Sequence, residues 1–249
     1  MKQIYRFLYH LLQFIPFKSK KMRGFLHVLR FYYKGNDLIV LSNDGRKIKN
    51  PIKIPKCLQI QTYLNTHNNK IVIAENQKTG SCIKLNFYNA NYVNIEIGKN
   101  NMLCMTADIC GKNGYAIIGN NNYVCRATLY LYCSGKTTFN IGNNNLFSDG
   151  IVLWAGEGHS VINPVDKSVT NMGGNITIGN NNWVCQNICF LKRAKIGNGC
   201  IVGYGAVVGT DFSKNDNCVI AGNPAVVTKS NVQWSNQAPW EYNGKIYIE

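Results

Sequence analysis

The sequence has few acidic residues, few histidines and no long apolar run. Its 249 residues include 12 Asp and Glu against 27 Lys and Arg, which gives a formal net charge of +15. Such a charge attracts anions, whether a phosphorylated cofactor, an acidic polymer, nucleic acid or an anionic membrane surface, and does not choose among them. The chain is 45% apolar and 16% charged. This composition is typical of a folded protein and excludes a largely disordered one.

No stretch reaches the roughly 20 apolar residues that a membrane-spanning helix needs. The N-terminal apolar run is interrupted by Arg6, His10 and Gln13 and ends at Pro16 without a small-residue cleavage site. This pattern argues against a signal peptide. Because the apolar residues recur at helical spacing and basic residues follow them, residues 1–24 have two interpretations. They form either a helix packed on the protein or on a neighbouring subunit, or a basic amphipathic segment resting on a membrane.

Ten cysteines are present, but no CxxC pair and no Cys/His cluster has the spacing of a zinc site. Seven of them occupy positions within the repeats described below where small apolar side chains are expected. We predict that these are reduced core thiols: Cys104, Cys110, Cys125, Cys185, Cys189, Cys200 and Cys218. Reduced thiols favour a cytoplasmic location. If the N-terminal segment rests on a membrane, the protein would lie peripherally at the inner membrane.

A six-residue repeat dominates the second half of the chain. The phrase Ile-Gly-Asn-Asn-Asn occurs at residues 118–122, 141–145 and 178–182. A helix would place residues six apart on different faces, and a simple strand would show a period of two. A fixed short period of strand and turn is typical of a parallel β-helix. After Thr177 apolar residues recur every six positions: Ile178, Val184, Phe190, Ile196, Val202 and Val208.

The repeats divide the chain into four parts. We predict a helical segment at residues 1–35, a mixed region at 36–93 that caps the β-helix, the β-helix at 94–229 and a C-terminal tail at 230–249. Residues 161–175 break the six-residue rule, which predicts a loop extruded from one coil. The asparagines suit tight turns, and when stacked at one corner they would form a ladder of amide hydrogen bonds.

The segment 178–229 resembles the C-terminal half of the hexapeptide-repeat acetyltransferases. The matching phrases are IGNNNWV at 178–184, AKIGNGCIVGYGAVV at 194–208 and VIAGNPAVVTK at 219–229, of which AGNPA is the most specific. Upstream, EGHS at 157–160 and the spacing from His159 to Trp183 resemble the capsule-type polysialic acid O-acetyltransferases. The resemblance implies an all-β fold, a left-handed parallel β-helix with a short helical N-terminal segment and an extruded loop. It also implies a homotrimer with acetyl-CoA bound between adjacent subunits.

The transfer of an acetyl group to a hydroxyl needs a general base, and histidine is the usual one because its pKa lies near neutral pH. Of the four histidines, only His159 lies in the repeat region, beside the predicted loop. Glu157 is our candidate to orient its imidazole, with Asp149 and Asp166 as rivals. The resemblance places Trp183 near the acetyl end of the site, and the alternative is a tryptophan that packs at a subunit interface.

The resemblance also implies where the cofactor would lie. Small residues at the groove floor would let pantetheine approach the backbone, although Tyr204 is bulkier than the residue usually found there. Basic residues would either meet the phosphates of CoA or remain solvated. The predicted cofactor-binding residues are Gly203, Tyr204, Gly205, Ala206, Lys195, Asn223, Pro224 and Lys229. We expect no metal in the site.

The predicted function is therefore an acetyl-CoA-dependent O-acetyltransferase that modifies a sugar hydroxyl of a surface glycan such as capsule, lipooligosaccharide or O-antigen. The positive charge favours an acidic acceptor, for example one that contains sialic acid. The alternatives are an acetyltransferase for serine, a simple sugar or an antibiotic, and a non-catalytic β-helix scaffold. A γ-type carbonic anhydrase would need three zinc-binding histidines. No aromatic-basic motif indicates a nucleic-acid partner.

Overall fold

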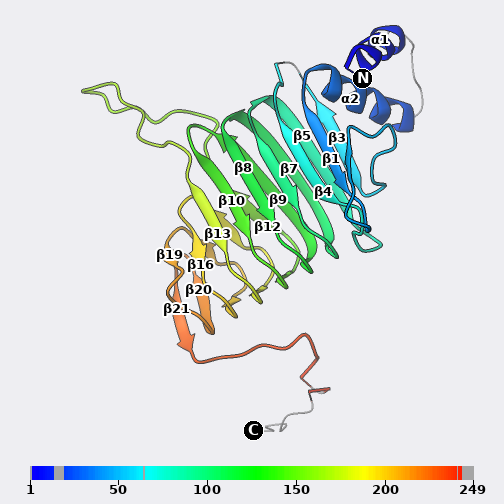
Figure 1. The fold of residues 1–249 in the computed structure, drawn as a ribbon. Helices are drawn as coiled ribbons and strands as arrows, with labels where there is room; N and C mark the ends of the chain where they lie inside the picture. Colours follow the sequence, from blue (N-terminus) through cyan, green and yellow to red (C-terminus); the bar gives the residue numbers. More distant parts are fainter. Residues whose placement is uncertain (1, 14–19, 64, 240, 243–249) are drawn as a thin grey trace.

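The computed structural model describes residues 2–13, 20–63, 65–239 and 241–242, and most of them wind into a parallel β-helix with two helices at its N-terminal end (Figure 1). Residues 14–19, which belong to the predicted membrane-contacting segment, lie outside the described residues, as do residues 243–249 of the predicted tail. No helix among the described residues is long and apolar enough to cross a membrane.

The helices α1 (Lys2–Leu12) and α2 (Lys20–Tyr33) pack on each other and cover the first coils. Phe31 of α2 is fully buried, and its ring centroid lies 5.2 Å from that of Phe87 in the β-helix. The ring of Tyr5 in α1 packs against Tyr32. The opposite face of α1 leaves three large apolar side chains 56–67% exposed: Ile4, Phe7 and Leu11.

The parallel strands form three faces. The first face is one ladder: β1 (Asp37–Leu41), β4 (Lys70–Ala74), β6 (Asn94–Ile97), β8 (Gly114–Ile118), β10 (Thr137–Ile141), β13 (Asn175–Ile178), β16 (Lys195–Ile196) and β19 (Asp211–Phe212). The second face contains β11 (Leu146–Phe147), β14 (Trp183–Val184), β17 (Ile201–Val202) and β20 (Cys218–Gly222). The third contains β3 (Leu58–Thr62), β5 (Cys82–Asn91), β12 (Ile151–Trp154), β15 (Cys189–Leu191) and β18 (Val207–Val208).

Two long strands, β7 (Met102–Lys112) and β9 (Tyr123–Cys133), run through the corner between the second and third faces. They join these faces into a single twelve-stranded sheet. Antiparallel strands lie at both ends of the stack, where β2 (Lys47–Lys49) pairs with β1 and β21 (Ala225–Ser230) pairs with β20.

The predicted start of the β-helix at residue 94 is wrong. Residues 36–93 do not merely cap the β-helix, because β4 continues the ladder of β6 and β5 continues that of β7, all in parallel register. The six-residue pattern is hard to see in this part because β5 spans ten residues without a break. The helices α1 and α2 cover the N-terminal end instead.

The six-residue pattern after Thr177 is confirmed as the core of the β-helix. Its members from Ile178 to Val208 are at most 2% exposed, and each points into the stack. The prediction for the cysteines is only partly right. Cys200 and Cys218 are buried, but Cys125 is exposed and the other four are half-buried, because their side chains take outward positions on the coils.

Each letter of the phrase Ile-Gly-Asn-Asn-Asn has its own structural role, as residues 118–122 show. Ile118 ends a first-face strand and is buried. Gly119 is required because a Cβ there would lie 2.5 Å from the carbonyl oxygen of Gly142 in the next coil. Asn120 receives hydrogen bonds in an outer amide ladder, Asn121 has a left-handed φ of 58°, and Asn122 belongs to a buried inner ladder. The predicted asparagine ladder is confirmed.

The inner ladder generates a stability prediction. The side chain of Asn145 donates to the carbonyl of Gly179 at 3.0 Å and accepts from the backbone N–H of Asn182 at 2.9 Å. We expect Asn145→Ala to lower the free energy of unfolding by about 2–4 kcal/mol, because it leaves the buried N–H of Asn182 and the partly buried carbonyl of Gly179 without this partner. Denaturant unfolding would measure this loss. Asn140→Ala, an exposed position in the same coil, is the matched control, and equal effects of the two changes would contradict the ladder's role.

Candidate active site

The three faces meet at three corners, and the predicted site residues are distributed among them. The first corner, between the first and second faces, carries the asparagine turns and Trp183. The second corner, between the second and third faces, carries Gly203 and its neighbours. The third corner, between the third and first faces, carries the loop with His159. These positions follow from the strands that flank each turn.

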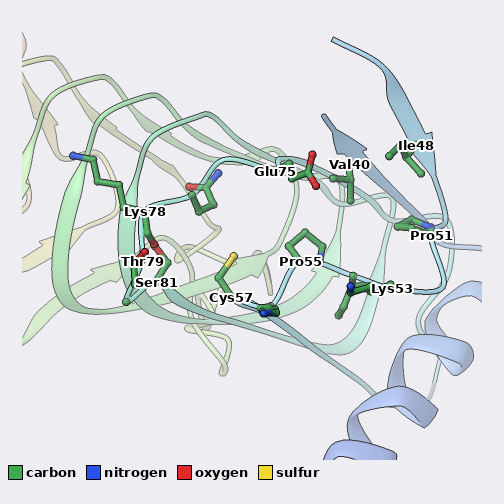
Figure 2. Close-up of a pocket in the computed structure, with 14 residues that line it drawn as sticks. Val40, Ile48, Pro51, Lys53, Pro55, Cys57, Glu75, Lys78, Thr79 and Ser81 are labelled. Atoms are coloured by element: carbon green, nitrogen blue, oxygen red, sulfur yellow. The ribbon is translucent and has the colours of Figure 1, made fainter. Parts of the chain in front are cut away.

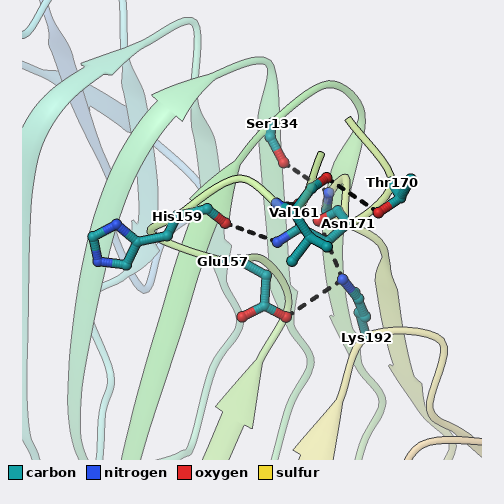
Figure 3. Close-up of polar contacts among 8 residues, drawn as sticks. Ser134, Glu157, His159, Val161, Thr170, Asn171 and Lys192 are labelled. Carbon is teal, nitrogen blue, oxygen red and sulfur yellow. Dashed lines mark hydrogen bonds and ion pairs between the residues drawn. The ribbon is translucent and has the colours of Figure 1, made fainter. Parts of the chain in front are cut away.

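The loop at the third corner comprises residues 155–174, between β12 and β13, and extends far from the β-helix (Figure 1). The predicted extruded loop is confirmed. A single antiparallel bridge joins Ile162 and Val169 in its arm. Its base is held to the coils by the backbone N–H of Gly173, which donates to the hydroxyl of Ser134 at 2.7 Å (Figure 3). The sequence keeps regular strands on both sides, so the insertion does not disturb the stacking.

His159 is exposed at the base of this loop. Its carbonyl oxygen accepts a hydrogen bond from the side chain of Asn171 at 2.8 Å, which joins the two arms. Its imidazole points away from Glu157, whose carboxylate lies 3.3 Å from the ammonium of Lys192 (Figure 3). Lys192 also donates to the carbonyl of Asn171 at 3.1 Å. Within this chain Glu157 therefore helps to fasten the loop, and the structure does not place it against the imidazole.

Trp183 begins β14 and is half-buried at the first corner. The ring of Trp234, from the segment after β21, lies 6.2 Å from it, and the Trp234 indole N–H donates to the carbonyl of Asn181 at 2.6 Å. Sequence analysis missed Trp234, because nothing in the tail's pattern indicates that it returns to the first corner. One full face of the coil separates Trp183 from the corner that holds His159.

The structure brings six predicted cofactor-binding residues together at the second corner. Gly203 follows β17, and a Cβ there would lie 3.0 Å from that of Ala221 in the next coil. The hydroxyl of the exposed Tyr204 accepts from the side chain of Asn187 at 2.9 Å. The group comprises Gly203, Tyr204, Gly205 and Ala206, with Asn223 and Pro224 directly after β20 in the coil below.

The two predicted basic contacts lie elsewhere. Lys195 begins β16 at the third corner and forms a 2.6 Å ion pair with Asp211. The hydrogen bond from Lys195 holds the pKa of the Asp211 carboxyl well below its usual range. Lys229 lies opposite Val219 on β21, near the first corner. Neither lysine shares the second corner with Gly203, since residues far apart along a coil occupy different corners.

A pocket of about 460 Å³ lies against the third face beside the loop base, and sequence analysis did not find it. Burial raises the pKa of Tyr88 to about 12 and raises that of Tyr132, and the charge of Asp108 adds to both shifts. Residues from three successive coils and from the loop line this pocket: Tyr88, Asp108, Cys110, Gly111, Tyr132, Cys133, Ser134, Glu157 and Gly158.

A second pocket, of about 670 Å³, lies at the N-terminal end, far from the loop along the stack (Figure 2). Lys53, Lys56 and Lys78 line it together with Glu75 and Cys57. Burial raises the pKa of the Cys57 thiol, which disfavours the thiolate that a nucleophile needs. The pocket beside the loop is the better candidate for acid–base chemistry, because its lining includes Gly158, the chain neighbour of His159. Among the described residues, no cluster of His, Cys, Asp or Glu could hold a metal ion.

The chain is similar in sequence to known sugar O-acetyltransferases over part of its length. The chain is 28% identical over 100 residues to a polysialic acid O-acetyltransferase of Escherichia coli O1:K1, covering 40% of this chain and 32% of the relative. It is 31% identical over 112 residues to a galactoside O-acetyltransferase of Escherichia coli K12, covering 45% of this chain and 52% of that relative. The matches thus span about a third and about half of these relatives. No family model matches the chain.

Two solved structures share the architecture over most of their length. The polySia-specific acetyltransferase NeuO superposes with a TM-score of 0.65 at 22% identity, covering 82% of this chain and 87% of NeuO. The polysialic acid O-acetyltransferase OatWY superposes with a TM-score of 0.56 at 21% identity, covering 86% and 94%. The chain shares the fold of these two acetyltransferases. The predicted resemblance and the predicted left-handed parallel β-helix are thereby confirmed.

Proposed function

We propose that this protein is an O-acetyltransferase that moves an acetyl group from acetyl-CoA to a hydroxyl of a surface glycan, with His159 as the general base. The observation that carries the proposal is the position of His159. It is exposed at the base of the extruded loop and directly follows Gly158, which lines the pocket. The similarity to two sugar O-acetyltransferases over the repeat region supports the reaction class.

The reaction follows from these groups. The neutral imidazole of His159 accepts the proton of the acceptor hydroxyl as its oxygen attacks the thioester carbonyl. The tetrahedral intermediate then expels the CoA thiolate, which takes the proton back from the imidazolium. The products are an O-acetyl ester and free CoA. Because this chemistry needs no redox partner, the protein has only to align the two substrates and provide the base.

A complete site requires a second copy of the chain. His159, Trp183 and the group from Gly203 to Ala206 lie at three different corners, and a face of packed strands separates each pair. We propose a homotrimer in which the third corner of one subunit faces a neighbour's Trp183 or its Gly203 corner. Acetyl-CoA would lie in that groove, with pantetheine against the small residues. Lys195 and Lys229 would meet its phosphates from adjacent subunits.

The acceptor follows from charge and similarity. A net charge of +15 attracts an acidic polymer at long range, and one relative is named for polysialic acid. A sialic-acid-containing capsule, lipooligosaccharide or O-antigen is therefore the proposed acceptor. Acetyl-CoA as donor makes the cytoplasm the proposed place of the reaction.

We further propose a peripheral contact of α1 with the inner membrane. Ile4, Phe7 and Leu11 recur at helical spacing and form an exposed apolar stripe. The exposed Arg6 and Arg23 on the two helices would face anionic lipid headgroups. An exposed apolar stripe flanked by basic residues is typical of interfacial helices.

The first prediction concerns the base. His159→Ala should lower kcat about 10²–10⁴-fold, the usual contribution of a general base, while acetyl-CoA still binds. Release of free CoA in the presence of a glycan panel measures turnover, and calorimetric titration measures binding. His10→Ala, an exposed histidine on α1, should keep full activity. Unchanged turnover in the His159 variant would refute the assignment.

The second prediction concerns the shared site. His159→Ala and Trp183→Ala chains should each be nearly inactive alone. Mixed trimers refolded from equal amounts should regain about a quarter of the wild-type activity, because that share of interfaces unites an intact His159 with an intact Trp183. Native mass spectrometry would verify the mixing. Mixed trimers without regained activity would show that His159 and Trp183 do not meet across a subunit interface.

The third prediction concerns the membrane. The protein should sediment with phosphatidylglycerol vesicles and not with phosphatidylcholine vesicles. Phe7→Glu should weaken this binding at least about tenfold, because it removes a ring that would insert into the bilayer and adds a carboxylate that the anionic headgroups repel. Val165→Glu, at an 88% exposed apolar position on the loop, is the control and should bind like the wild type. Equal binding of both variants would exclude a role for α1.

A further inference from the structure

The pocket at the loop base, called the slot below, is lined by two tyrosines from strands that lie two apart in the sheet. Tyr88 on β5 and Tyr132 on β9 are both in register with Cys110 on the intervening strand β7. Two inter-strand spacings put their backbones about 10 Å apart. The pocket volume of about 460 Å³ lies within the usual range for small-molecule sites. The slot therefore suits one ring-sized group.

The aromatic rings are placed for stacking rather than for core packing. Tyr88 is 36% exposed, and its ring stacks on that of Tyr63 with centroids 4.5 Å apart and planes 15° from parallel. Tyr132 is half-buried and makes an edge contact with Tyr130. Each tyrosine is thus fixed from one side by another aromatic ring. Both tyrosines line the slot, and the face of an aromatic ring is a flat apolar surface that complements the C–H face of a pyranose ring.

Two carboxylate residues line the slot, Asp108 and Glu157, and Asp108 lies two residues before the Cys110 position that separates the two tyrosines. Asp108 accepts a hydrogen bond from the side chain of Asn86 at 2.7 Å, and Asn86 is only 4% exposed. A buried amide therefore fixes the direction of this carboxylate. A carboxylate can only accept hydrogen bonds, so it suits the hydroxyl groups of a sugar.

The local charge of the slot opposes the charge of the whole chain. The charge of Glu157 is balanced by Lys192, whereas none of the ion pairs among the described residues involves Asp108. An unpaired carboxylate repels a second carboxylate within a few ångströms. A sugar acid is therefore disfavoured here, and an uncharged sugar is favoured.

We propose that Tyr88, Tyr132 and Asp108 form the subsite for the acceptor sugar, and that this subsite selects a neutral sugar ring. The inference rests on the proposed acetyl transfer by His159 and adds its acceptor specificity. The glycan as a whole can still be acidic, because its charged units lie outside the slot. The unit in the slot, which receives the acetyl group, is a neutral hexose or N-acetylhexosamine.

Steady-state kinetics with methyl glycosides of neutral hexoses, N-acetylhexosamines, uronic acids and sialic acid would test this subsite. We expect kcat/KM for the best neutral glycoside to exceed that for the sugar acids at least about tenfold, the effect of one uncompensated charge. Asp108→Asn, which retains the contact with Asn86, should reduce that ratio below about threefold. A preference of the wild type for sugar acids would overturn the proposal.

The aromatic wall has its own test. Tyr132→Ala should raise the acceptor KM about tenfold and leave the KM for acetyl-CoA unchanged, whereas Tyr132→Phe should change neither by more than about twofold, because stacking needs only the ring. Tyr123→Ala, at a 43% exposed tyrosine on the same strand β9, is the matched control. An unchanged acceptor KM in a folded Tyr132→Ala variant, with thermal unfolding as the check, would remove Tyr132 from the subsite.

Binding separates a failure of this inference from a failure of the proposed function. Saturation-transfer NMR with the same methyl glycosides detects the slot without any turnover. If neutral glycosides bind and Tyr132→Ala abolishes the signal while no acetyl is transferred, the subsite stands and the proposed reaction fails. If acetyl transfer depends on His159 but neutral glycosides neither bind nor react, the reaction stands and the subsite is refuted.

Discussion

The constraint on which this molecule depends is the register between successive coils. Every strand of the β-helix takes its hydrogen bonds from the coils above and below it, so a coil that shifts by one residue would turn its core side chains outward. The amide ladders oppose such a shift. Asn122, Asn145 and Asn182 bond both to one another and to backbone groups at the same corner, so each fixes two neighbours at once. The glycine before each ladder allows the close approach that these bonds need.

This constraint also decides where functional groups can lie. Inward positions are filled by the core, and strand residues must stay in register, so the chain can be lengthened only at a corner. The twenty residues from 155 to 174 enter at the third corner, between β12 and β13, and leave the flanking ladders intact. Outward positions on the faces remain free to vary. The tyrosines and the aspartate of the slot occupy such positions on adjacent strands.

Sequence analysis predicted the parts of the fold in which the local backbone geometry limits which side chains are possible. The phrase Ile-Gly-Asn-Asn-Asn marks a turn because only certain residues tolerate its backbone, and the six-residue pattern marks the core. The first coils were not predicted, because β5 runs without a break where the later coils have a turn between two short strands. The ion-pair partner of Glu157 was not predicted for another reason. Lys192 lies 35 positions away in the sequence, and nothing in the local pattern of either residue shows that one coil brings them together.

The acceptor slot shows the limit of arguing from net charge. A formal charge of +15 describes a field that acts over roughly a Debye length and raises the local concentration of anions. Recognition occurs at contact distance, where Asp108 outweighs distant lysines because the charge nearest a ligand dominates its interaction. Long-range attraction of an acidic polymer and short-range selection of a neutral ring are compatible in one molecule. A positive surface can attract an acidic glycan while a negative slot accepts one of its neutral rings, and the sugar that meets His159 is then decided by three side chains on the third face.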